Sequence, residues 1–278
     1  MALNLDAVGK TTKPLEFTYN WKDAVLYALG IGAKKAELDF LFEGRGPKVF
    51  PTFAVLPTFP VCAELFTITG GNLLGVVHGS QSITLHRPFA SSGKLTTVGT
   101  VQGIYDLKRM AQAVFTTETR DESGELLCES EWGILFRMDG GFNGPRPPKT
   151  EKHRVPEREP DFEVEETTAP EQALLYRLCG DLNPLHADPE IGEKAGFGQP
   201  ILHGLATYGF AGRAVLHACC DGDPSRLKRL SGQFRRPVWP GDTLVTRGWN
   251  EDGRVLLQTR TKERPEEMAF TNAFAVVE

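Results

Sequence analysis

The feature that most constrains the fold is a charged, proline-rich segment near the middle of the chain. Between Gly140 and Asp161 the residues are mostly Gly, Pro, Lys, Arg and Glu, with few apolar side chains. Such a composition favours an extended segment on the surface. A chain of 278 residues is long enough for two units of ordinary size. We therefore predict an N-terminal unit over residues 1–145, a linker over 146–161 and a C-terminal unit over 162–278.

The two units carry short sequence echoes in the same order. Residues 24–30, Ala-Val-Leu-Tyr-Ala-Leu-Gly, are echoed by residues 173–180, Ala-Leu-Leu-Tyr-Arg-Leu-Cys-Gly. Arg87-Pro88 in the first unit is echoed by Arg236-Pro237 in the second. Each match alone is weak, but two matches in one order indicate a duplication. Chance similarity is the alternative.

Apolar periodicity and turn residues predict the elements of the second unit. A short helix is expected over residues 170–179, with Thr168 as its cap. A longer helix is expected over 200–220, because its apolar residues recur at helical spacing, and Asp221-Gly222 should end it. Strands are expected over 227–235, 244–250, 254–262 and 268–277.

The first unit repeats this order of elements. A helix is expected near residues 57–67, followed by strands over 78–86, 94–105, 110–119 and 125–138. A helix followed by an antiparallel sheet, twice, is an α+β pattern. The simplest packing is a sheet that wraps one long buried helix in each unit.

Composition narrows the function classes. Hydrophobic residues make up 40% and charged residues 24%, so the chain can bury a core, and the net charge of -5 argues against nucleic-acid binding. Five cysteines without framework spacing indicate a reducing compartment. No signal peptide and no apolar run long enough to cross a membrane is visible, so we expect a cytoplasmic protein without a membrane partner. The last residues, Val276-Val277-Glu278, are not a peroxisomal Ser-Lys-Leu signal.

The most informative segment is a polar loop between the two helices of the second unit. It reads Gly180-Asp181-Leu182-Asn183-Pro184-Leu185-His186-Ala187-Asp188-Pro189. The two prolines force irregular backbone, so several polar groups can point at one place. Addition of water to an enoyl thioester needs one group that takes a proton from water and one that delivers a proton to carbon. Asp181 and His186 could hold a water between them and do both.

The same reaction needs a group that stabilises the thioester oxygen. Backbone N–H groups at a helix N-terminus serve this purpose, and His203-Gly204 lies near the start of the longer helix. Other roles stay open, because Asp181 and Asn183 could be turn formers and His186 a packed loop residue. His186, Asp188 and His203 could also bind a metal, but no standard ligand spacing is present.

These motifs resemble a known family. The loop, together with Gly196-Phe197 and Pro200-Ile201-Leu202-His203-Gly204-Leu205, is similar to the (R)-specific 2-enoyl-CoA hydratases of the MaoC-like group. Further similarity lies at Leu56-Pro57-Thr58-Phe59, His78-Gly79-Ser80-Gln81 and Pro237-Val238-Trp239-Pro240-Gly241, and includes the hydratase part of the peroxisomal multifunctional enzyme. The resemblance implies a double hotdog fold in which only the C-terminal repeat is catalytic. The N-terminal repeat is then expected to house the acyl chain.

The resemblance also implies roles for single residues. It places Asp181 and His186 on the catalytic water, Asn183 as the group that orients them, and Gly204 as the N–H donor to the thioester carbonyl. Contacts to the CoA part of the substrate are expected from His78, Gly79, Lys108 and Phe234, with Arg87, Arg235 and Arg236 as further candidates. The family often has Asp-Lys-Gly where this chain reads Asp106-Leu107-Lys108-Arg109, so Lys108 stands one position later than the lysine of that motif.

The expected activity is hydration of a trans-2-enoyl-CoA to the (R)-3-hydroxyacyl-CoA in fatty-acid metabolism, such as β-oxidation. It needs no metal and no cofactor beyond the CoA of the substrate, and a homodimer is expected from the resemblance. The alternatives are a dehydratase that acts on a carrier-protein-bound or specialised 3-hydroxyacyl substrate, and a non-catalytic acyl-CoA-binding hotdog protein. A binding protein would need neither Asp181 nor His186.

Overall fold

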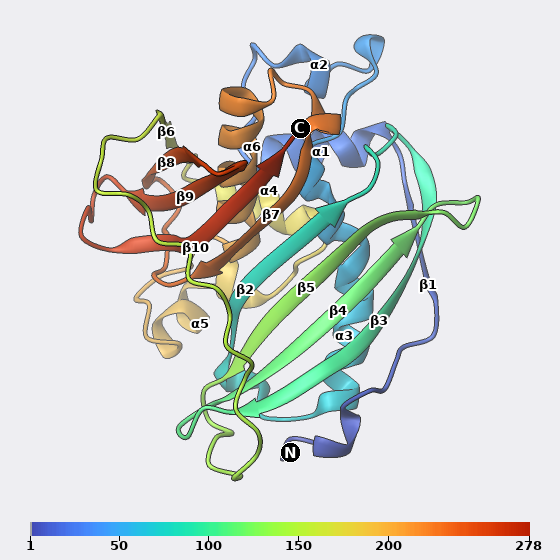
Figure 1. The fold of residues 1–278 in the computed structure, drawn as a ribbon, viewed down its shortest axis with the longest axis vertical. Coiled ribbons are helices and arrows are strands. Elements are labelled where there is room, and N and C mark those ends of the chain that lie inside the picture. Colours follow the sequence, from blue (N-terminus) through green and yellow to red (C-terminus); the bar gives the residue numbers. More distant parts are fainter. Residues whose placement is uncertain (1) are drawn as a thin grey trace.

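The computed structural model describes residues 2–278 and contains one continuous antiparallel sheet of ten strands (Figure 1). The strands follow the order β1-β3-β4-β5-β2-β7-β10-β9-β8-β6 across the sheet. Their bounds are β1 Leu15–Tyr19, β2 Val76–Leu85, β3 Gly93–Asp106, β4 Ala111–Arg120, β5 Leu126–Phe136, β6 Phe162–Thr167, β7 Leu227–Phe234, β8 Thr243–Glu251, β9 Arg254–Thr261 and β10 Met268–Val277.

The strand order confirms the predicted duplication. Read from its outer edge inward, the first half of the sheet is β1-β3-β4-β5-β2, and the second half is β6-β8-β9-β10-β7. Each strand therefore has a counterpart five strands later in the chain. The halves meet where β2 pairs with β7, with Gln81 opposite Gly232. Because the counterparts β2 and β7 pair antiparallel, the two halves are related by a pseudo-twofold axis at this seam.

Helices cover one face of the sheet, behind the strands in Figure 1. The α-helices are α1 Trp21–Gly30, α2 Leu38–Leu41, α3 Phe59–Thr69, α4 Gln172–Tyr176, α5 Pro189–Lys194 and α6 Gly204–Cys219. The long helices α3 and α6 pack against the first and second half of the sheet, respectively. On α6 every residue from Leu205 to Leu216 is buried, which confirms the predicted central helix of the second repeat.

The core helix of the first repeat corrects one expectation from the sequence. A 3-10 helix, η3 (Pro51–Thr58), runs directly into α3, and together they form a 19-residue stretch with a mean hydropathy of 1.4. By length and composition this stretch could cross a membrane, contrary to the sequence-based expectation. In the structure 61% of its most apolar window is buried inside the protein, as suits a core helix.

Two predicted helix boundaries were wrong, both because of tertiary contacts. The long helix begins at Gly204 rather than at residue 200, because the Leu202 N–H bonds to the Val238 carbonyl at 2.7 Å and keeps the preceding residues extended. Thr168 caps no helix. Its hydroxyl donates to the Asp242 carbonyl at 3.0 Å and so joins the chain before α4 to the turn before β8.

Residues 140–161 contain no helix or strand. The segment starts beside β3, where the Gly141 and Asn143 N–H groups bond to the Asp106 carboxylate, and then crosses the outer face of the second half of the sheet (Figure 1). The His153 N–H bonds to the Asn272 side chain on β10 at 2.7 Å. The Arg158 carbonyl accepts from the Trp249 indole on β8 at 2.9 Å. These contacts fix the segment to the sheet. The division into units at residues 145 and 162 stays a prediction.

The interior of the first repeat is filled with side chains. Phe53, Phe115, Phe136, Val61 and Leu65 are fully buried there. An acyl chain could enter this interior only if such side chains moved. The expected role of the first repeat as the acyl-chain housing therefore stays a prediction, with this condition attached.

Candidate active site

The polar loop singled out in the sequence lies between η5 (Arg177–Cys179) and α5. It begins with Gly180, whose φ of +127° favours glycine, and an ideal Cβ at this position would lie 3.2 Å from the Phe59 ring. The Asn183 side chain accepts from the Leu185 N–H at 3.1 Å and caps the 3-10 turn η6 (Pro184–His186). The turn carries His186 into the protein, where it is 7% exposed.

The hydrogen bonds of His186 define its tautomer. Nδ1 lies 2.8 Å from the Ile201 carbonyl oxygen, which can only accept, so Nδ1 carries the proton. Nε2 of the neutral ring therefore holds a lone pair. Burial lowers the pKa of His186, and the negative charge of Asp181 opposes this shift in part. The ring is thus a neutral hydrogen-bond acceptor near pH 7.

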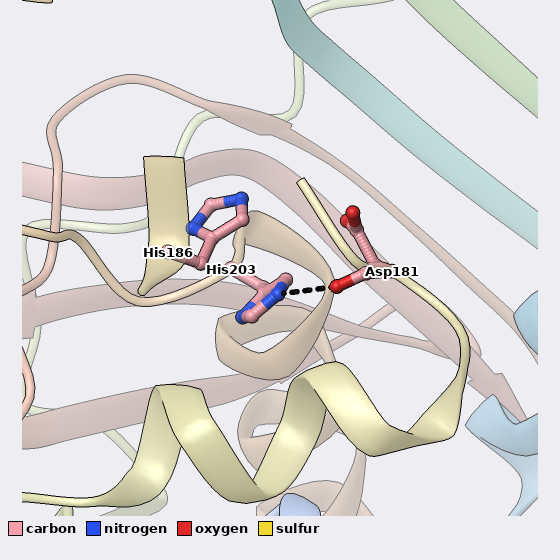
Figure 2. Close-up of side chains that lie close together, drawn as sticks. All are labelled: Asp181, His186 and His203. Atoms are coloured by element: carbon pink, nitrogen blue, oxygen red, sulfur yellow. Dashed lines mark hydrogen bonds between the residues drawn. The ribbon is translucent and has the colours of Figure 1, made fainter. Parts of the chain in front are cut away.

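A second histidine, His203, contacts both members of the predicted pair (Figure 2). Its Nε2 donates to the backbone carbonyl of Asp181 at 3.2 Å, and its ring stacks on His186 with centroids 3.6 Å apart. Burial, with a smaller contribution from His186, lowers the pKa of His203 to about 2. Side-chain ligand atoms of all three residues lie within 4.8 Å of one another. The structure therefore brings Asp181 and His186 together.

Asn183 is not placed as the resemblance implies. Its side chain is used for the cap of η6, and its contact with Asp181 is made by the backbone N–H, 3.2 Å from the carboxylate. The orienting effect on Asp181 thus comes from the turn. Both residues act as turn formers, which was the alternative left open from the sequence.

The N-terminus of α6 lies next to these groups. Among residues 2–278 the Gly204 N–H has no hydrogen-bond acceptor, as is usual for the first residue of a helix. The Phe234 ring lies 3.5 Å from an ideal Cβ on Gly204 and covers one side of it. A free N–H with a positive helix end behind it suits an oxygen that gains negative charge.

Three residues of the first repeat form the opposite wall of the site. The ring of His78 on β2 stacks on Trp132 of β5, with centroids 4.6 Å apart and planes 5° apart, and meets Phe234 edge-on at 5.0 Å. Trp132 in turn contacts Phe59, which covers Gly180. A chain of aromatic contacts, Phe59–Trp132–His78–Phe234, thus connects Gly180 of the polar loop with Gly204. The site lies at the junction of the two repeats.

A β-bulge sets the position of His78. His78 pairs with Ile134, but Ser80 pairs with Gly133, so Gly79 is an extra residue in β2. An ideal Cβ on Gly79 would lie 2.9 Å from the Leu135 side chain, which a glycine avoids. Burial lowers the pKa of His78 to about 4, so its ring is neutral. Its Nε2 has no partner among the described residues.

The basic residues expected to contact CoA lie in different parts of the structure. Arg235 and Arg236 are exposed and directly follow Phe234. Lys108 is exposed in the β3–β4 turn and has a φ of +73°. A φ in this range is uncommon for a residue other than glycine. The role of Lys108 as a CoA contact stays a prediction.

Arg87 is not brought to the site. It follows the opposite end of β2 from His78 and forms ion pairs with Asp121 at 2.9 Å and Glu125 at 2.7 Å. At about 3.3 Å per residue, the nine residues from His78 to Arg87 separate them by roughly 30 Å. Arg87 therefore fastens the β4–β5 turn, and the structure does not support it as a phosphate contact.

The metal site considered from the sequence is not assembled as expected. Asp188 is exposed and caps α5 by accepting from the Glu190 N–H at 2.9 Å. Asp181, instead of Asp188, lies near the two histidines. The planes of the His186 and His203 rings are only 25° apart. Imidazole lone pairs lie in the ring plane, so two stacked rings cannot direct both at one ion at about 2.1 Å. The arrangement suits proton transfer better than metal binding.

Sequence reasoning missed the contributions of Trp132 and Phe59. Trp132 alternates inward on β5 and is 5% exposed, so its sequence pattern is that of any core residue. Its indole donates to Ser130 at 3.2 Å, and the Ser130 hydroxyl lies 2.7 Å from that of Thr117. Only the pairing of β2, β5 and β7 reveals that Trp132 faces the site. His203 was noticed in the sequence, but without its contacts to Asp181 and His186.

The fold and the site together define a double hotdog protein with an Asp–His pair in its second repeat. Residues 17–138 match the MFE-2 hydratase 2 N-terminal domain, and residues 151–270 match the MaoC like domain. A Mycobacterium tuberculosis protein described as having a double hotdog fold superimposes with a TM-score of 0.59 over 96% of this chain and 94% of that one. Its 15% identity shows the fold alone.

Closer relatives cover nearly the whole chain. Enoyl-CoA hydratase 2, peroxisomal, from Arabidopsis thaliana is 41% identical over 89% of this chain and 87% of that protein. The 3-hydroxyacyl-thioester dehydratase Y of Mycobacterium tuberculosis is 39% identical over 93% and 92%. A MaoC-like dehydratase from Phytophthora capsici superimposes with a TM-score of 0.89 and 33% identity, over 99% and 98% of the two chains. The chain belongs to the two-repeat MaoC-like family that includes enoyl-CoA hydratase 2.

Proposed function

We propose that this protein adds water reversibly to a trans-2-enoyl-CoA and forms the (R)-3-hydroxyacyl-CoA. The observation that carries the proposal is the meeting of Asp181, His186 and the free Gly204 N–H at the junction of the repeats. The names of the Arabidopsis and Mycobacterium relatives support the two directions of this reaction. The (R) configuration and a place in fatty-acid metabolism are supported by the family alone.

The chemistry follows from the tautomer of His186. A water held between the Asp181 carboxylate and His186 Nε2 can donate to both acceptors. As its oxygen bonds to C3, a water proton passes to the pair, and the pair returns a proton to C2. The C2–C3 π bond is consumed, and both residues regain their starting protonation. Because Asp181 and His186 interact, their pKa values are properties of the pair, and the formal base is not assigned to one residue.

The thioester carbonyl is proposed to lie against the N-terminus of α6. Its oxygen gains charge as water adds, and the Gly204 N–H stabilises that charge. Phe234 and His78 would then flank the pantetheine part of CoA, and Arg235 and Arg236, which follow Phe234, are proposed as phosphate contacts. No metal or organic cofactor takes part in these steps.

The test is turnover of crotonyl-CoA and trans-2-decenoyl-CoA by the purified protein, followed by the loss of enoyl-thioester absorbance. The product is coupled separately to an (R)-specific and an (S)-specific 3-hydroxyacyl-CoA dehydrogenase. Coupling to the (R)-enzyme alone supports the proposal. No turnover of either substrate by folded protein would contradict it and favour a carrier-bound or specialised substrate, which the same assay tests with acyl-carrier-protein thioesters.

The assembly is a separate proposal. We expect a homodimer, and light scattering of the eluting protein measures its mass against the 30.6 kDa of one chain. A mass of one chain at micromolar concentration would contradict it. The cytoplasmic location expected from the sequence stays a prediction, since relatives with a peroxisomal enzyme name are among the similar proteins.

A further inference from the structure

We infer that His203 is a positioning residue that holds the two members of the catalytic pair in register with each other. The inference rests on the proposed hydratase function, because it assigns His203 a task in the same site. The sequence suggested His203 only as a candidate metal ligand, and the names of the relatives give this histidine no role. What carries the inference is that one buried side chain makes a separate contact to each of the two residues.

The first contact fixes Asp181. The His203 Nε2–H donates to the Asp181 backbone carbonyl at 3.2 Å, on a loop whose residues Leu182 and Asn183 are exposed. The Asp181 carboxylate itself accepts only from the Asn183 N–H of the same loop, among the described residues. His203 therefore provides the hydrogen bond that joins this end of the loop to the start of α6.

The second contact fixes His186. The two imidazole rings stack with centroids 3.6 Å apart and planes 25° apart, and the His203 ring also contacts the Tyr176 ring, with centroids 4.9 Å apart. His186 is thereby held between this stack and its own hydrogen bond to the Ile201 carbonyl. Rotation of the His186 ring would break either the stack or the hydrogen bond, so the direction of its Nε2 lone pair is fixed.

The first contact requires a proton on Nε2 of His203, and the stacking on His186 favours a neutral ring. The ring is 1% exposed, and its Nδ1 has no partner among the described residues. A charged His203 would place two positive rings face to face whenever His186 takes a proton. A neutral ring can stack on His186 in both of its protonation states. The geometry thus suits a residue that stays neutral while its neighbour transfers protons.

Two variants separate the contacts. His203→Phe keeps a flat ring that can stack on His186 but loses the N–H to Asp181. His203→Gln keeps an N–H donor but loses the ring. We expect each to lower kcat on crotonyl-CoA by ~10-fold or more, while KM changes by less than ~3-fold, because substrate contacts are retained. A purely structural role would lower the folded fraction and leave kcat per folded molecule unchanged.

Coupling to Asp181 is the decisive readout. If His203 acts through Asp181, then His203→Phe should cost little further rate in an Asp181→Ala background, since the group it positions is gone. If the loss of kcat in the double variant equals the product of the losses in the two single variants, the inference is overturned. So would loss of wild-type activity with a chelator and its recovery with Zn²⁺, because the three residues would then be metal ligands.

A measurement without turnover keeps this inference distinct from the hydratase proposal. Amide hydrogen exchange over residues 181–186 should be faster in both variants than in the wild-type protein, with exchange in β7 unchanged. If wild-type protein hydrates neither substrate, the function proposal fails while the exchange experiment still tests the positioning. Unchanged exchange over this loop in both variants would overturn the role of His203.

Discussion

Arg213 on α6 of the second repeat donates to Glu37, which lies between α1 and α2 of the first repeat, with Nη2 2.6 Å from Oε2. Glu166 on β6 accepts from the same guanidinium, and the His217 ring lies 2.6 Å from Glu37. The Arg213 side chain is only 7% exposed and that of Glu37 is 11% exposed. This buried ion pair joins the central helix of the second repeat to the first repeat.

Loss of Arg213 should be strongly destabilising. Arg213→Met leaves Glu37 and Glu166 buried without their cation, and breaking a buried pair in this way costs about 3–5 kcal/mol in the free energy of unfolding. Urea unfolding followed by circular dichroism measures it. The control is Arg45→Met, which removes an ion pair with Asp39 whose side chains are 55% and 50% exposed, and should cost at most about 1 kcal/mol. Equal effects of the two substitutions would contradict the importance of the buried pair.

Asp181 and His186 should be necessary for turnover and unnecessary for folding. We expect Asp181→Asn and His186→Gln each to lower kcat on crotonyl-CoA by ~10²-fold or more, because each removes a partner of the catalytic water. Circular dichroism and the thermal midpoint should remain close to those of the wild type. Asp188→Asn is the matched control, since Asp188 only caps α5. Near-wild-type turnover of both site variants would contradict the assignment.

The acid limb of the rate profile should lie at unusually low pH. Catalysis needs a lone pair on His186 Nε2, and burial lowers the pKa of this ring below its ordinary value of 6.5. The midpoint of the acid limb of kcat/KM should therefore fall below pH 6.5. The charge of Asp181 opposes the effect of burial, so the residual activity of Asp181→Asn should show a midpoint at still lower pH. A wild-type midpoint at or above pH 6.5 would contradict this role of His186.

Two glycines on α6 should respond oppositely to the same substitution. The nearest neighbour of a Cβ on Gly204 is the Phe234 ring, at an ordinary 3.5 Å, whereas a Cβ on Gly209 would lie 2.3 Å from Ile31. Gly204→Ala should fold normally and lower kcat/KM by ~10-fold or more, because the methyl group occupies space next to the proposed oxyanion donor. Gly209→Ala should cost about 1–3 kcal/mol of stability and keep its kcat per folded molecule. Thermal unfolding and crotonyl-CoA kinetics of both variants test this pair, and full kcat/KM in Gly204→Ala would argue against a thioester at this helix end.

Local sequence signals predicted much of the fold and the proximity of Asp181 and His186. Alternation and turn residues predicted eight of the ten strands, and the order of the sheet bears out the duplication suggested by short echoes. The edge strands β1 and β6 were missed. Asp181 and His186 are five residues apart, so the turn chemistry of one loop is enough to bring them together. Signals of this kind depend only on residues that are close together in the sequence, so they could be interpreted without a structure.

Contacts between distant residues could not be predicted in this way. His78 and Phe234 meet because β2 pairs with β7, and nothing in either strand specifies that partner. The start of α6 was misplaced because the Leu202 N–H is taken by Val238, 36 positions later. Such contacts depend on tertiary packing, which overrides local propensity.

The buried histidines should make the protein sensitive to acid. The pKa of His203 is lowered by burial to about 2, while in the unfolded chain a histidine titrates near 6.5. Below pH 6.5 the unfolded state therefore binds a proton that the folded state does not, and the free energy of unfolding falls as the pH falls. His203 alone should change the free energy of unfolding by ~1.4 kcal/mol per pH unit between pH 6 and 4. His203→Phe should reduce the measured slope by about that amount in urea unfolding, whereas Gly209→Ala should lower stability at every pH and leave the slope unchanged. An identical slope in wild-type protein and His203→Phe would mean that His203 takes up a proton in the folded state.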